Sequence, residues 1–123
     1  MSYLTPRKRA RALGASGGGT EHHWYTVVTS TALLLLIPLF VFTFGRAVGL
    51  PHEEAVLYYT RPFPALVAAL TLAVGWWHFA KGVHVLITDY TRGMTRKALI
   101  VVSHIVSYAA ALVSLYAIAR LAL

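Results

Sequence analysis

Three long apolar segments, separated by short polar stretches, dominate the pattern of hydrophobic and polar positions along the chain. Each is of the order of 20 residues, the length at which an α-helix crosses the hydrocarbon layer of a membrane. We predict transmembrane helices over residues 24–44, 63–88 and 98–121. The predicted fold class is therefore an all-α membrane protein, with three transmembrane helices that form part of a multi-subunit helical bundle.

Two regions flank or interrupt these helices. Residues 1–23 are polar, basic and rich in glycine, which predicts a flexible cytoplasmic tail ahead of a membrane anchor domain over residues 24–123. A mitochondrial targeting peptide would also be rich in arginine, but it needs an apolar face that this tail lacks. Pro38 is expected to kink the first helix. A short interfacial structure is expected over residues 45–62.

Composition supports the membrane class and narrows the chemistry. The 123 residues are 58% hydrophobic and 12% charged, too apolar a balance for a soluble domain. The net charge of +7 does not indicate nucleic-acid binding, because the basic residues flank the apolar segments. Without cysteine, the chain cannot hold an iron-sulfur cluster, so a metal would need histidine. No P-loop, nucleophile elbow or paired carboxylate motif is present, so catalysis by this chain alone is not expected.

The basic residues also predict an orientation. Cytoplasmic loops of membrane proteins carry an excess of lysine and arginine. The first loop and the C-terminus carry three basic residues, whereas the tail and the second loop carry seven: Arg7, Lys8, Arg9, Arg11, Arg92, Arg96 and Lys97. The N-terminus is therefore expected in the cytoplasm.

The stretch from Trp76 to Tyr90 places ionisable groups inside an apolar helix, where they are costly and usually functional. Eleven positions separate His78 from Asp89, about three helical turns at roughly 100° per residue, so both lie on nearly one face. Gly82 and Val85 share that face. An imidazole can bind a metal centre, and a glycine one turn away leaves room for a flat macrocycle.

The other polar groups of the spans have plainer interpretations. His84 lies roughly 120° round the helix from His78, which favours packing or hydrogen bonding over ligation. His104 is expected to make a polar contact with a neighbour. His22 and His23 are expected at the interface, and Lys81 is expected to extend its ammonium group toward the membrane surface.

His78, ten intervening residues, and then Asp89 and Tyr90 stand at the cytoplasmic end of the second of three helices. This arrangement resembles the hydrophobic membrane anchor (D) subunit of succinate dehydrogenase, respiratory complex II. The entry to the first helix, from Thr20 to Trp24, is also similar to that family. Small residues along the helices are in keeping with partner helices at close approach.

The resemblance implies that His78 is one axial ligand of haem b, with the second ligand supplied by a sister cytochrome b anchor subunit. Tyr90 would donate a hydrogen bond to a ubiquinone carbonyl, with Asp89 beside it. Flavoprotein and iron-sulfur subunits would dock on the cytoplasmic face, and the assembly would sit in a bacterial inner membrane. Electrons from succinate would then reach the quinone here.

The chain departs from the family at two positions. Many relatives have an arginine near the position of Val28, where it can reach a haem propionate. Lys81 is a cation where relatives commonly have an uncharged residue, and it lies one turn beyond His78. We therefore hypothesise that Lys81 pairs with a propionate in place of that arginine.

Two other functions remain open from the sequence. The chain could be a structural or assembly subunit of another membrane complex, with no cofactor of its own. It could also be a small proton-coupled transporter component that uses Lys81 and Asp89 as a relay. Haem absorbance in the purified assembly would separate the first function from both alternatives.

Overall fold

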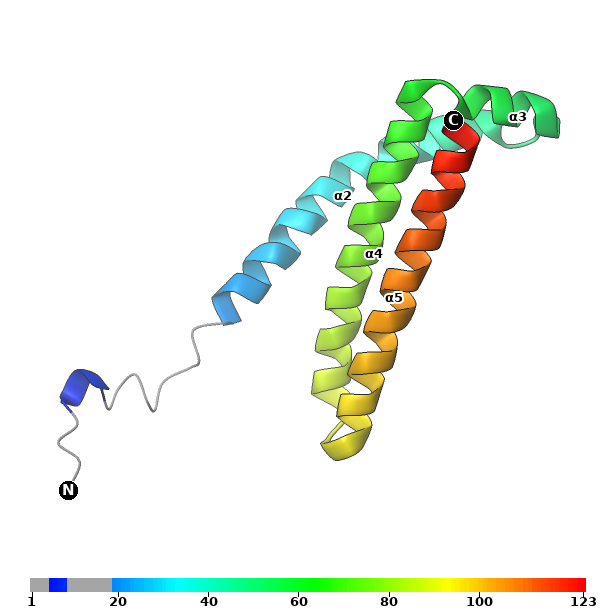
Figure 1. The fold of residues 1–123 in the computed structure, drawn as a ribbon. Helices are drawn as coiled ribbons and strands as arrows, with labels where there is room; N and C mark the ends of the chain where they lie inside the picture. The colour runs from blue at the N-terminus through cyan, green and yellow to red at the C-terminus, as the bar shows by residue number, and fades with distance from the viewer. Residues whose placement is uncertain (1–4, 9–18) are drawn as a thin grey trace.

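The computed structural model describes residues 5–8 and 19–123, and the longer of these two ranges is almost entirely helical (Figure 1). Its helices are α2 (Gly19–Ala47), α3 (His52–Tyr59), α4 (Pro62–Tyr90) and α5 (Gly93–Ala122). Three are long and apolar enough to cross a membrane, over His23–Ala47, Pro62–Tyr90 and Gly93–Ala122. The predicted fold class is confirmed. The predicted flexible tail lies largely outside the described residues.

Helix α4 is the centre of the structure. Helices α2 and α5 each pack against α4, and within the described residues they make no contact with each other. Figure 1 shows α4 and α5 running antiparallel along their length, whereas α2 crosses at an angle and diverges toward its N-terminus. The short helix α3 contacts all three long helices at one end of the assembly. The central helix therefore has two faces that contact different neighbours.

Small side chains allow α4 and α5 to approach closely. Ala68 and Ala80 are each 1% exposed, and Ser107 of α5 is fully buried. The Ser107 hydroxyl donates to the carbonyl oxygen of Ser103 at 2.7 Å, so no polar atom is left unpaired there. Trp76 Nε1 donates to Ser114 Oγ at 3.2 Å, which adds a hydrogen bond between the two helices. Such contacts are typical of helix association in lipid, where apolar burial provides little driving force.

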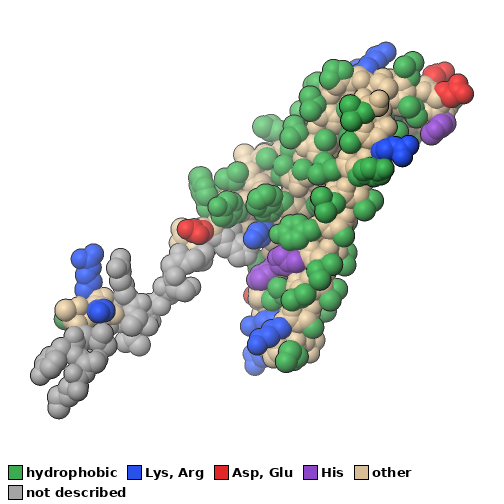
Figure 2. Space-filling view, in the orientation of Figure 1, with side chains coloured by type: hydrophobic (Ala, Val, Ile, Leu, Met, Phe, Trp, Pro, Cys, Tyr) green, Lys and Arg blue, Asp and Glu red, His purple; other side chains and the backbone are tan. Residues whose placement is uncertain are grey.

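The outer faces of the helices are apolar. Leu34 and Phe42 of α2 and Leu112 of α5 are each at least 70% exposed. Figure 2 shows hydrophobic side chains along the sides of the molecule, with basic ones gathered where α4 and α5 meet. That end contains Arg92, Arg96 and Lys97. This distribution suits helices surrounded by lipid and by partner helices.

The short helix in the first loop is the interfacial structure that the sequence suggested, although its depth in a membrane stays a prediction. Pro51 precedes α3, and Pro62 begins α4, a position where the missing N–H costs no helical hydrogen bond. Tyr59 at the end of α3 is buried, and this burial raises the pKa of its hydroxyl above the usual value. The phenol therefore stays neutral at physiological pH.

The long helices extend beyond the predicted bounds of 24–44, 63–88 and 98–121. Each has 29 or 30 residues, about 44 Å at 1.5 Å per residue, against a hydrocarbon layer of about 30 Å. The additional turns contain polar residues, so hydropathy alone did not reveal them. Helix α2 is continuous through Pro38, and the kink expected there stays a prediction.

The turn between α4 and α5 is short and tightly held. Arg96 Nε donates to the carbonyl oxygen of Thr91 at 2.7 Å, and Gly93 has a φ of 65°. Side-chain-bearing residues are strained in this left-handed conformation. The turn therefore depends on glycine at this position, and it fixes the end of α4.

We expect Gly93→Ala to lower the free energy of unfolding by about 1–2 kcal/mol, because alanine is disfavoured at this φ. Thermal unfolding of the purified, detergent-solubilised protein measures the change. Gly45→Ala is the matched control, since Gly45 lies inside α2 and an added Cβ there meets no atom within 4 Å. Equal losses in the two variants would contradict the importance of the turn conformation.

Candidate functional site

The candidate site begins at His78, which lies on the face of α4 that packs against α2. Its side chain is half-buried, and its Nδ1 lies 2.9 Å from Thr29 Oγ1. Thr29 is part of α2, 49 positions earlier in the chain. One ring nitrogen of His78 is thus held by a neighbouring helix, and the other, Nε2, is the ring atom that a metal would use.

The face of α4 that contains His78 is exposed from Gly82 toward the C-terminal end of the helix. Helix α4 is continuous from Pro62 to Tyr90, so His78, Gly82, Val85 and Asp89 share one side of it. A Cβ added at Gly82 would have no neighbouring atom within 4 Å, and Val85 is 43% exposed. This surface is therefore left uncovered by the described residues, with room for a group that another chain helps to enclose.

The predicted quinone residues lie at the end of α4, away from His78. Tyr90 is the last residue of α4 and is 84% exposed, and Asp89 beside it is also exposed. Tyr90 is twelve positions after His78, about 18 Å along the helix axis. The structure thus gives two separate positions along one helix. Lys81 lies between them and is half-buried.

A second polar cluster lies between α4 and α5. The rings of His84 and His104 have centroids 5.5 Å apart at 88°. Nδ1 of His104 donates to the carbonyl oxygen of Ile100 at 2.8 Å, since a carbonyl can only accept, and the ring also lies 5.9 Å from that of Tyr108. His84 therefore faces α5 while His78 faces α2. The sequence placed His84 away from His78 but did not pair it with His104.

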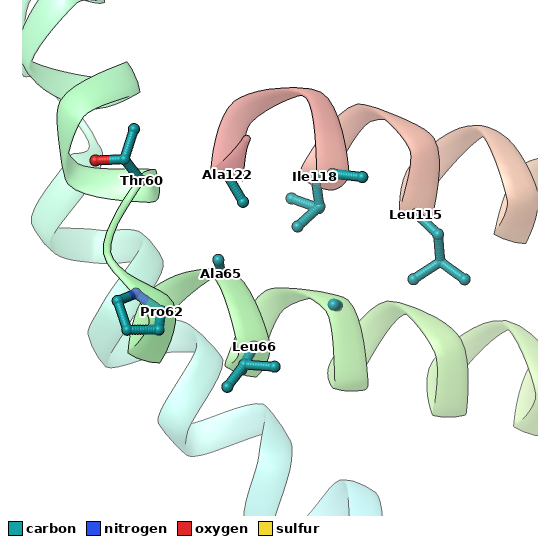
Figure 3. A pocket seen from close by; sticks show the side chains of 9 residues that line it. Thr60, Pro62, Ala65, Leu66, Leu115, Ile118 and Ala122 are labelled. Atoms are coloured by element: carbon teal, nitrogen blue, oxygen red, sulfur yellow. The ribbon is translucent and has the colours of Figure 1, made fainter.

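An apolar cavity lies far from these residues, at the other end of α4. It has a volume of about 380 Å³ and lies between the start of α4 and the end of α5 (Figure 3). Its walls are apolar apart from Thr60, and no side chain that lines it can ligate a haem iron. Its chemistry suits a hydrocarbon chain or an apolar side chain.

At this face the chain offers one side chain, His78, that can ligate a haem iron from one side of the ring. Within the described ranges, no group of three or more histidine, cysteine or acidic side chains could hold a metal ion. His78 supplies a single imidazole, and Gly82 one turn away leaves an open surface. A haem iron with two protein ligands would therefore need a second ligand besides His78.

Thr29 is the residue of this site that sequence reasoning missed. Its segment was noted only because it lacks an arginine. The signal available was the pair of hydroxyl residues Thr26 and Thr29, one helical turn apart in an apolar span. His23 is exposed, whereas the side chain of His22 lies outside the described residues.

Comparison with known proteins identifies the family to which the chain belongs. The family model described as succinate dehydrogenase/fumarate reductase transmembrane subunit matches residues 1–118. A protein of Paracoccus denitrificans, the succinate dehydrogenase hydrophobic membrane anchor subunit, is 47% identical over 123 residues, which cover 100% of this chain and 95% of that protein. No solved structure matches the chain significantly. The resemblance seen in the sequence is thereby confirmed, and the chain belongs to the family of succinate dehydrogenase/fumarate reductase transmembrane subunits.

Proposed function

We propose that this chain is the membrane anchor subunit of a succinate:quinone oxidoreductase, and that it helps to bind haem b and ubiquinone. The name of the Paracoccus denitrificans relative supports the succinate enzyme over the fumarate enzyme. The observation that carries the cofactor assignment is the position of His78, an imidazole inside the central membrane helix beside an open glycine surface.

In this proposal His78 provides one axial ligand and a sister cytochrome b anchor subunit provides the other. Haem b, when bound, supplies a one-electron carrier within the membrane. The chain's own contribution is to hold the imidazole with its Nδ1 bonded to α2, and to leave space at Gly82 for the edge of a flat ring. The exposed outer faces of α2 and α5 are then available to the sister subunit's helices.

Tyr90 and Asp89 form the quinone end of the site in this proposal. The exposed hydroxyl of Tyr90 donates a hydrogen bond to a quinone carbonyl, and Asp89 shapes the site or relays a proton. Both lie next to the basic turn, whose residues include Arg92 and Arg96. By the positive-inside rule this turn and the N-terminus are cytoplasmic. Flavoprotein and iron-sulfur subunits would dock there, on the inner membrane of a bacterium.

Lys81 has a separate role in the proposal. It lies one turn beyond His78, about 4.5 Å along the helix axis toward the cytoplasmic end. Its ammonium group pairs with a haem propionate, replacing the arginine that many relatives have near Val28. Pairing offsets the cost of a lysine in this half-buried position.

We expect His78→Ala, expressed together with the other subunits, to remove or strongly alter the haem spectrum, because a methyl group cannot ligate iron. Optical and electron paramagnetic resonance spectra of the purified complex measure this. His84→Ala is the matched control, since it removes a histidine from the side of α4 that faces α5. An unchanged bis-histidine spectrum in His78→Ala would rule out the assignment and favour a cofactor-free structural subunit.

We expect Tyr90→Phe to weaken quinone reduction, because the change removes only the hydroxyl. A hydrogen bond of about 0.5–1.5 kcal/mol corresponds to a few-fold to tenfold loss of affinity. Succinate oxidation with an artificial acceptor should stay at the parental rate. The control is Tyr116→Phe. Tyr116 is an exposed tyrosine near the C-terminal end of α5, whereas Tyr90 lies beside the N-terminal end of that helix. Quinone kinetics equal to the parent in Tyr90→Phe would exclude this role.

We expect Lys81→Met to lower the haem midpoint potential, because a nearby cation favours the reduced, more negative cofactor. Redox titration of the assembled complex measures the potential. Lys97→Met, which removes a cation from the exposed turn region, should leave it unchanged. A parental potential in Lys81→Met would leave this lysine as an ordinary interfacial side chain.

A further inference from the structure

The hydroxyl of Thr29 links two helices through three short contacts. Its Oγ1 lies 2.9 Å from the carbonyl oxygen of Tyr25 and 3.1 Å from that of Thr26, both on its own helix. The same atom lies 2.9 Å from Nδ1 of His78 on α4. A threonine hydroxyl has one proton to donate and lone pairs with which to accept. The three contacts therefore cannot all be donated by Thr29.

The two carbonyl oxygens determine which atom donates in each of these hydrogen bonds. Neither the Tyr25 nor the Thr26 oxygen can donate, so the Thr29 proton is directed to them. The remaining contact is then made by Nδ1–H of His78 donating to a lone pair of Thr29 Oγ1. A neutral imidazole carries one ring proton, so Nε2 is left with a free lone pair. This is the form of histidine that binds a metal.

We propose that Thr29 is a positioning residue for the haem ligand: it fixes the tautomer and ring orientation of His78, so that the lone pair of Nε2 is directed to the iron. This role rests on the proposed function of His78. The bond runs from His78 through the Thr29 hydroxyl to the backbone of α2, so the ring is anchored to a rigid helix rather than to a mobile side chain.

The position of the pair in the membrane strengthens this role. Thr29 lies inside the predicted span of α2 and His78 is half-buried, so water does not readily replace a lost partner. Without Thr29, the Nδ1–H group would lose its acceptor on α2. The imidazole would then be a weaker electron donor and freer to rotate.

Three variants of the fully assembled complex test the proposal by redox titration and by electron paramagnetic resonance of the oxidised haem. Thr29→Val keeps the shape of the side chain but removes the hydroxyl, and Thr29→Ser keeps the hydroxyl. Thr31→Val is the matched control, because it makes the same change on α2 at an exposed hydroxyl that donates to the Val27 carbonyl oxygen, at 2.9 Å, outside the network of Thr29 and His78.

The expected result is a higher midpoint potential and a changed resonance spectrum in Thr29→Val, because an imidazole that has lost its hydrogen-bond acceptor is a weaker electron donor and stabilises the oxidised iron less. Thr29→Ser and Thr31→Val should match the parent. Loss of haem from Thr29→Val with retention in Thr29→Ser would also support the role of the hydroxyl.

Two results would overturn the proposal: parental potential and spectrum in Thr29→Val, or the same change in Thr29→Ser as in Thr29→Val. These results differ from failure of the proposed function, which His78→Ala reports independently through an unchanged haem spectrum. The Thr29 effect is also opposite in sign to that expected for Lys81→Met, so the two residues can be separated by the direction of the potential shift.

Discussion

The lack of water inside a bilayer is the constraint on which this structure depends. Every backbone N–H and C=O group in the hydrocarbon layer must find a partner within the protein, and a continuous helix satisfies this requirement locally. Side-chain polar groups are under the same constraint. Thr29, Thr43 and Ser107 each return their proton to a carbonyl oxygen of their own helix. The few polar groups that reach another helix therefore determine how the helices are arranged.

Helix α4 shows how these contacts are divided. Through His78 it reaches α2, and through Trp76 and His84 it reaches α5. The outer faces of α2 and α5 offer mainly apolar surface. The function proposed here follows from this division, because one side of α4 has an imidazole, that of His78, beside a surface that the described residues leave open.

The sequence predicted most of the fold and part of the site. Three apolar segments predicted the three candidate membrane-spanning helices, because length and hydropathy are local properties. The starts at Gly19 and Gly93 were missed, since polar turns beyond the hydrocarbon layer look like loops. His78, Asp89 and Tyr90 could be singled out by their spacing within one helix. The pairing of Thr29 with His78, and of His104 with His84, could not be predicted, because contacts between residues on different helices depend on packing angles that no local pattern encodes.

The central position of α4 also bears on how the protein enters the membrane. Of the three spans, α4 has the lowest mean hydropathy and the largest buried share. Its histidines, lysine and tryptophans make its transfer from the translocon into lipid less favourable than that of α2 or α5. The strongly apolar α2 is synthesised first and can remain beside the translocon as a surface for α4. Biogenesis is therefore expected to be cooperative, with α4 retained in the bilayer by its neighbours and the nascent hairpin stabilised once α5 has emerged.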